Sequence, residues 1–129
     1  MPPKKEGSEG FGTLIPVEVL LENMQREIKD GEQFVEAHKE EVAEYIELGV
    51  KEAEDGDRSM LDAAIVKRDA LKDLEARITE VRGVSEEIKK MLAKKEDVKE
   101  EKRAALASYQ ALQRAYKRAS SLLVPDVGG

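Results

Sequence analysis

Apolar side chains recur along this chain at alternating spacings of three and four residues. Three runs show this spacing, at residues 17–49, 60–92 and, more weakly, 105–123. The spacing places the apolar side chains on one face of an α-helix and is typical of helices that pack along a seam. The pattern therefore predicts an all-α protein.

The expected helices belong to one bundle, residues 13–123, and cover about 16–54, 59–95 and 97–123. Residues 1–12 are rich in Gly, Pro and Lys, a composition that predicts a disordered N-terminal tail. Residues 124–129 are expected to form a C-terminal tail, because Pro125 cannot extend the last helix.

Two polar segments separate the apolar runs. In the first, Gly56 can adopt the left-handed conformation that ends a helix, and Ser59 can cap the next helix with Asp62 at the third helical position. The second, residues 93–103, contains nine charged residues in eleven. It is either a turn in which Asp97 caps the third helix, or part of one long continuous helix. We favour the turn, because a compact bundle buries all three apolar stripes within one chain.

The apolar face of the first run is wider than a two-stranded seam requires. Leu20, Phe34 and Leu48 share one flank, and Ile46 and Val50 lie nearby. A wide apolar face implies at least two neighbouring helices. The predicted fold is an elongated antiparallel three-helix bundle with coiled-coil-like packing. The alternative is a long helical hairpin that dimerises into a four-helix bundle.

Three glycines lie inside the expected helices. Gly31 and Gly49 occupy seam positions, where they either admit the close approach of another helix or of a partner side chain, or leave packing defects; Gly31 is alternatively a kink. Gly83 falls on the outer face, where a glycine costs a helix roughly 1 kcal/mol. We expect the helices to continue through all three, because the apolar spacing keeps its phase.

Charge is distributed unevenly along the chain. Residues 17–54 carry twelve acidic and four basic side chains, a net charge of −8, whereas residues 55–95 and 96–129 each carry +1. This asymmetry favours pairing of the acidic first helix with the two later helices of the same chain. It argues against nucleic acid or an anionic membrane as the main partner, because both require a basic face.

Composition limits the kinds of site that the chain can form and its expected location in the cell. Charged residues make up 39% of the chain and aromatic residues 4%, and cysteine is absent. No disulfide, thiol nucleophile or cysteine zinc site can therefore form, which fits a reducing compartment. No apolar stretch approaches the roughly 18 residues of a membrane span, and the N-terminus lacks the apolar region of a signal peptide. We expect a cytoplasmic protein with no membrane span.

His38 is the only histidine, and it lies on the seam. It is either a pH-sensitive group whose protonation destabilises the bundle, or a core-edge histidine bonded to a neighbouring helix, which we favour. One histidine cannot supply the ligands of a typical zinc site. The chain also lacks an EF-hand loop, a glycine-rich phosphate loop and a nucleophile elbow. We expect no enzyme activity, no cofactor, no metal and no small-molecule substrate.

Apolar residues at the two ends of the bundle are candidates for partner binding: Phe11, Leu14, Ile15, Leu122, Leu123 and Val124. With the wide apolar face, they predict a non-enzymatic helical protein–protein interaction module. It would be a structural or adaptor subunit of a larger assembly, such as a cytoskeletal one. Its partner would be another protein, helical or cytoskeletal, or a second copy of the chain.

The alternative function is a small cytosolic folding chaperone or holdase of the prefoldin or tubulin-cofactor type. In gross outline the chain is similar to small helical cofactors such as tubulin-binding cofactor A, and to spectrin-like repeats. The likeness is architectural only and assigns a role to no individual residue.

Overall fold

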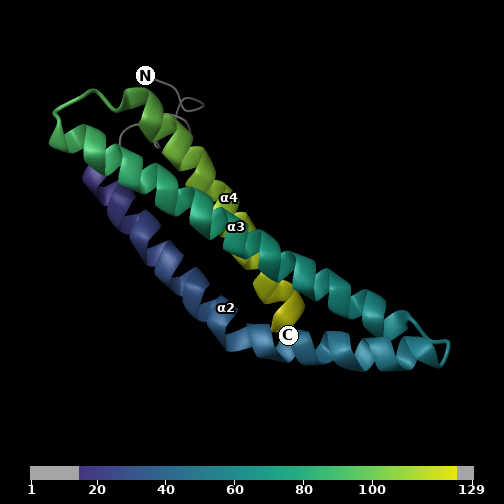
Figure 1. Ribbon diagram of the computed structural model, residues 1–129. Helices are drawn as coiled ribbons and strands as arrows, with labels where there is room; N and C mark the ends of the chain where they lie inside the picture. Colours follow the sequence, from purple (N-terminus) through teal and green to yellow (C-terminus); the bar gives the residue numbers. More distant parts are fainter. Residues whose placement is uncertain (1–14, 125–129) are drawn as a thin grey trace, which may run out of the picture.

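The structure, a computed structural model, describes residues 15–124. It contains three helices, α2 (Val17–Glu54), α3 (Ser59–Ala93) and α4 (Lys99–Leu123), and no strand within the described range. The helices run up, down and up, so that α3 lies antiparallel to both α2 and α4 (Figure 1). The predicted all-α three-helix bundle is confirmed, and a helix continuous through residues 93–103 is not present.

The apolar runs of the three helices meet in one core. α3 packs against α2 and against α4, whereas α2 and α4 touch each other over a smaller area. The most deeply buried large side chains come from all three helices: Leu20, Met24, Ile28, Leu74, Val81, Ile88 and Leu112. Burial of one such side chain contributes roughly 1.5–3 kcal/mol relative to its exposure to water. The core therefore follows the predicted seam.

α2 ends in a Schellman motif, in which the last carbonyl groups of a helix accept bonds from the residues that follow it. The N–H of Asp57 donates to the carbonyl of Glu52 at 3.1 Å, and the N–H of Gly56 donates to that of Ala53 at 3.0 Å. Gly56 has a φ of 101°, a conformation that glycine adopts without steric cost. The predicted role of Gly56 is thus observed.

α3 ends in the same motif, but without a glycine. The N–H of Glu96 donates to the carbonyl of Met91 at 2.9 Å, and the N–H of Lys95 donates to that of Leu92 at 2.9 Å. Lys95 has a φ of 60°, in the left-handed region that costs a residue with a Cβ roughly 1–2 kcal/mol. The second turn is therefore strained at one position where the first is not.

α3 and α4 each begin two residues after an aspartate that accepts the first backbone N–H of the helix, while the N-cap residues themselves are Arg58 and Val98. Asp57 accepts the backbone N–H of Ser59 at 3.0 Å and its hydroxyl at 2.7 Å. The Ser59 hydroxyl first, and then its N–H, lower the pKa of Asp57 below its usual value. Asp97 accepts the N–H of Lys99 at 3.1 Å. The predicted cap at Ser59 is wrong, because Ser59 is the first residue of α3 and donates to the Asp57 carboxylate.

Gly49 marks a close crossing of α2 and α3. A Cβ at Gly49 would lie 2.6 Å from the Cα and 2.8 Å from the N of Leu61, so backbone would have to move. A Cβ at Gly31 would lie 2.9 Å from Cδ1 of Ile78, the end of a flexible side chain. A Cβ at Gly83 would meet nothing within 4 Å. Of the two alternatives for the seam glycines, close approach is the one observed at Gly49.

α4 covers only part of the α2–α3 hairpin. α2 has 38 residues and α4 has 25, which correspond to lengths of about 57 and 38 Å. α4 ends beside the middle of α2, and beyond that point α2 and α3 continue as a pair (Figure 1). We call this two-helix extension, residues 41–69, the arm.

Substitution of Gly49 by alanine is expected to destabilise the protein by roughly 1–3 kcal/mol, because the new methyl group forces the two helix backbones apart. Gly83→Ala is the matched control on an open helix face and should stabilise by up to about 1 kcal/mol. Urea unfolding of both variants measures the difference. A Gly49→Ala variant as stable as the parent protein would show that the helices do not cross closely there.

Lys95→Gly is expected to raise the free energy of unfolding by roughly 1 kcal/mol, because glycine removes the left-handed strain at this residue. Lys94→Gly, one residue earlier and at a φ of −92°, should not stabilise. Thermal unfolding followed by circular dichroism compares the two variants. Equal effects of both substitutions would argue against strain at Lys95.

Candidate functional site

The residues predicted to bind a partner at the two ends of the chain do not form one surface. Ile15 is half-buried and packs against the core, and Phe11 and Leu14 lie outside the described residues. Leu123 is buried in the core, while Val124, directly after α4, is 49% exposed. α4 ends beside the middle of α2, whereas Ile15 precedes the start of α2 (Figure 1). The structure therefore leaves Val124 as the one freely exposed member among the described candidates.

The sixth candidate, Leu122, is half-buried and also packs against the core. With Leu123, it belongs to the part of α4 that holds the bundle together. Substituting either residue would therefore test packing as much as partner binding.

His38 bonds within its own helix. Its Nδ1 donates to the carbonyl of Phe34 at 2.9 Å, and the two rings lie 4.2 Å apart between centroids. Because a carbonyl only accepts, Nδ1 carries the proton, and protonation of Nε2 leaves this bond intact. The predicted bond to a neighbouring helix is not observed. The geometry gives His38 a local packing role.

One flank of α2 faces α4 along the covered half of the bundle. Leu20 on this flank is 1% exposed, and Phe34 is 9% exposed with its ring 5.3 Å from that of Tyr116 on α4. Leu48 lies fourteen residues after Phe34, which is four turns of a seam-forming helix, so it lies on the same flank. Leu48 is 49% exposed. The flank that α4 covers at Phe34 is thus open at Leu48.

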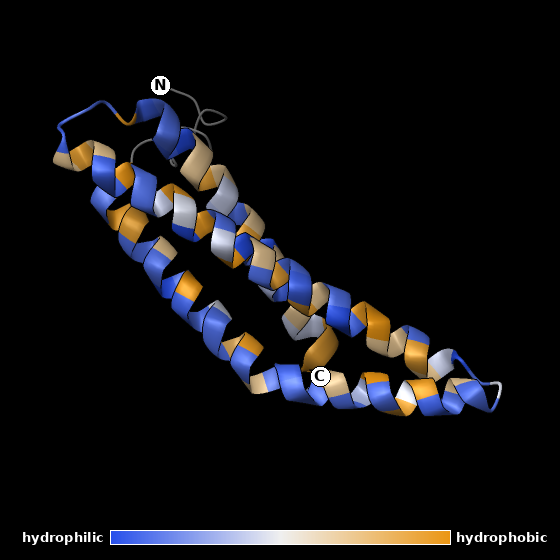
Figure 2. Cartoon of the chain, in the orientation of Figure 1, coloured by the Kyte–Doolittle hydropathy of each residue, from blue (hydrophilic) through white to orange (hydrophobic). Residues whose placement is uncertain are grey.

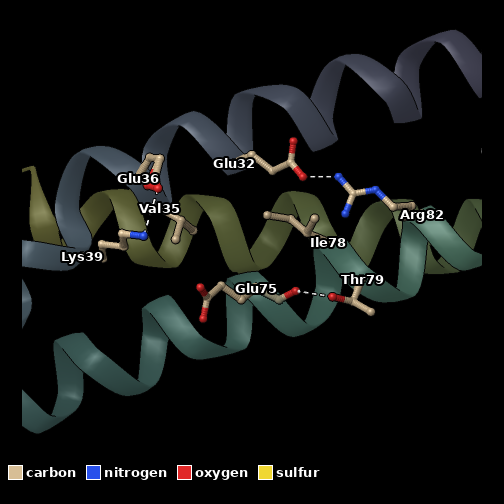
Figure 3. A pocket seen from close by; sticks show the side chains of 8 residues that line it. All are labelled: Glu32, Val35, Glu36, Lys39, Glu75, Ile78, Thr79 and Arg82. Carbon is tan, nitrogen blue, oxygen red and sulfur yellow. Dashed lines mark hydrogen bonds and ion pairs between the residues drawn. The ribbon is translucent and has the colours of Figure 1, made fainter.

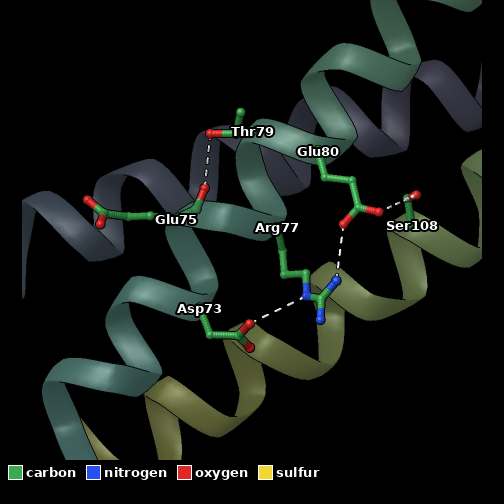
Figure 4. Close-up of polar contacts among 6 residues, drawn as sticks. All are labelled: Asp73, Glu75, Arg77, Thr79, Glu80 and Ser108. Carbon is green, nitrogen blue, oxygen red and sulfur yellow. Dashed lines mark hydrogen bonds and ion pairs between the residues drawn. The ribbon is translucent and has the colours of Figure 1, made fainter. Parts of the chain in front are cut away.

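The corresponding flank of α3 is marked by a polar contact to α4 (Figure 4). The Ser108 hydroxyl of α4 donates to Glu80 at 3.4 Å, and Arg77 bonds the same carboxylate at 3.1 Å. Val66 lies fourteen residues before Glu80, again four turns along one flank. Val66 is 44% exposed. Both helices of the arm therefore present an apolar side chain where α4 would lie if it were longer.

These residues define a surface that we call the arm face, which consists of Glu41, Tyr45, Leu48, Glu52 and Val66. The Tyr45 hydroxyl donates to Glu41 at 3.1 Å, and this bond is the main cause of the raised pKa of Tyr45. Lys67 of α3 lies over the Tyr45 ring, with its Nζ 4.7 Å from the ring centroid. Hydrophobic positions are visible on both helices of the arm (Figure 2).

The charge of the arm is strongly negative. Residues 41–69 carry nine acidic and four basic side chains, a net charge of −5. α4 carries six basic and two acidic side chains, a net charge of +4. α4 therefore offsets part of the acidity of α2 along the covered half of the bundle, whereas the arm keeps a net charge of −5 with its own four basic side chains counted.

Burial of ionisable groups beneath α4 is visible in their pKa values. Burial is the main cause of the raised pKa of Glu27, with a smaller contribution from Asp30. Burial likewise raises the pKa of Tyr109 and of Tyr116 on α4. Contact between α2 and α4 thus shields these polar groups in part from water.

A second candidate surface is a depression between α2 and α3 (Figure 3). Its polar rim contains an ion pair between Glu32 and Arg82 and another between Lys39 and Glu36 at 2.9 Å. Thr79 donates its hydroxyl to a carbonyl of its own helix at 3.2 Å. Among these lining residues, no nucleophile is bonded to a base.

Two further findings apply to residues 15–124. No group of three or more His, Asp or Glu side chains is placed to hold a metal ion. No helix is long and apolar enough to cross a membrane.

Comparison of the chain with protein-family models, curated proteins and solved structures finds no match. The function must therefore be argued from the residues themselves. Sequence reasoning placed Leu48 on the correct flank but did not select it or Val66 as a binding residue. The available signal was the length of the first run, which exceeds that of the third by fourteen residues, about four turns.

Because only two helices pack together in the arm, its backbone amides should open at a lower free energy than those of the three-helix part. We expect residues 43–53 of α2 to show protection factors at least about tenfold lower than residues 20–35 of the same helix. Hydrogen exchange followed by mass spectrometry measures both segments in one sample. Uniform protection along α2 would contradict the description of the arm as a less stable extension.

Proposed function

We propose that the protein is a non-enzymatic helical protein–protein interaction module, a structural or adaptor subunit that binds its partner through the arm face. The observation that carries this proposal is the contrast along one flank of α2. The flank is buried by α4 at Phe34 and half exposed at Leu48. Exposed apolar side chains that continue a packed interface are typical of a surface that another protein covers.

We infer that the protein performs no catalysis. The depression between α2 and α3 is bordered by ion pairs and by a threonine bonded to its own helix. Enzyme sites normally combine a concave apolar pocket with convergent polar groups. The described surface offers partner contacts more readily than such a pocket.

A folding chaperone or holdase is the second candidate. Val50, which lies away from the arm face, and Met60, at the start of α3, are 42% and 43% exposed. Apolar groups on more than one side of the arm could grip an unfolded client, and methionine adapts to varied surfaces. This candidate predicts suppression of client aggregation at near-stoichiometric ratios, whereas a dedicated adaptor has no such effect.

The double variant Leu48→Glu with Val66→Glu is expected to lose the partners that the tagged full-length protein captures from extract of its own organism. Charged side chains at these two positions remove the apolar contact without entering the core. Val19→Glu is the matched control, because Val19 is also 41% exposed but lies on the first turn of α2. Quantitative mass spectrometry of the captured proteins compares the variants.

Val124→Glu tests the competing idea that the chain end binds the partner. If Val124→Glu loses the partners and the double variant of Leu48 and Val66 retains them, the binding surface is the end of α4 and not the arm face. An unchanged partner set in all variants would contradict a binding role for either surface. Circular dichroism confirms that each variant keeps its helical content.

A further inference from the structure

We infer that the occupant of the arm face is a basic amphipathic helix supplied by a partner protein, which lies along the arm in continuation of α4. This inference rests on the proposed function, since it names the class of partner that the interaction module binds. Three observations carry it: the continuity of the surface, its charge, and the nature of the helix that already covers its other half.

Continuity specifies a helix as the occupant. Phe34 and Leu48 on α2, and Glu80 and Val66 on α3, are related by four helical turns in each case, so the arm face repeats the surface on which α4 packs. The α2 part of the arm, residues 41–54, is about 21 Å long. A helix of about four turns would cover it without entering the space that α4 occupies.

Charge specifies a basic occupant. The arm carries a net charge of −5, and Glu41 and Glu52 lie on the same flank as Leu48, two turns before it and one turn after it. Neither carboxylate forms an ion pair with a basic side chain among the described contacts. Lysine or arginine on the occupant would therefore meet acidic side chains at the edge of an apolar strip.

α4 already covers the other half of this surface, so its composition indicates which kind of helix fits there. It carries a net charge of +4 and buries small and aliphatic side chains against α2 and α3, namely Ala105, Leu112, Ala115, Ala119 and Leu123. The occupant we infer has the same two properties: a stripe of alanine and leucine at helical spacing, and several basic residues beside it.

Other occupants fit less well. A second copy of the chain would bring two arms of net charge −5 together, which opposes association. Residues 125–129 follow α4 directly, but their only charged side chain is Asp126. Residues 1–14 contain two lysines and two glutamates and join α2 at the end away from the arm.

A peptide with the sequence of residues 99–123, labelled with a fluorophore, is a defined probe of this surface. Full-length protein is expected to bind it with a Kd below about 100 µM. A counterpart peptide in which the six basic residues are glutamate should bind at least about tenfold more weakly, and raising the salt concentration should weaken only the basic peptide. Fluorescence anisotropy measures both.

The variant Leu48→Ala with Val66→Ala should lower affinity for the basic peptide at least about tenfold, because two apolar contacts are lost. Val19→Ala should leave it unchanged. Glu41→Gln with Glu52→Gln should weaken binding at low salt and have little effect at high salt. Alanine and glutamine favour helix, so these variants keep the arm folded.

Four outcomes would overturn the inference: no binding below about 100 µM, equal binding of both peptides, full binding by the Leu48 and Val66 variant, or a dimer that this variant dissociates in light scattering. The last result would make a second copy the occupant. Partners captured through the arm that are not basic helices would refute the inference but leave the proposed function standing. If the peptide binds but no captured partner depends on the arm face, the proposed function would be refuted and the surface's preference for a basic helix would stand.

Discussion

The pairing of α2 with α3 is the interaction on which the rest of the structure depends. The two helices bury apolar side chains against each other, and α4 packs on the surface that they create together. Gly56 reverses the chain between them, and Gly49 lets the two backbones come close at Leu61. Without this pairing, α4 would have no two-helix surface to cover.

The length of α4 then determines which part of that surface stays open. Fourteen residues separate Phe34 from Leu48 on one flank, yet the first is buried and the second is half exposed. The local sequence of α2 does not distinguish the two positions, because both are large apolar residues at equivalent phases of the helix. The difference arises where α4 stops, at Leu123. The end of α4 therefore decides that Leu48 is exposed although the equivalent Phe34 is buried.

The sequence predicts most of this fold, because helical periodicity, glycine and proline act locally. The three helices and the role of Gly56 follow from such signals. The left-handed Lys95 could not be predicted, since nothing local distinguishes it from Lys94. The cap was predicted at Ser59, one residue after the observed N-cap Arg58, because serine suits the start of a helix and arginine carries no such signal. The bond of His38 to its own helix depends on a side-chain rotamer, which spacing does not specify.

The distribution of charge connects the fold with the proposed partner. α2 carries a net charge of −8, and α4, at +4, brings basic side chains to part of its length. The arm is also acidic, but α4 does not extend over it. An acidic surface with an apolar strip repels its own copies while remaining attractive to a basic helix. In the proposed function, this asymmetry is the reason that the arm would bind a different, basic protein rather than a second copy.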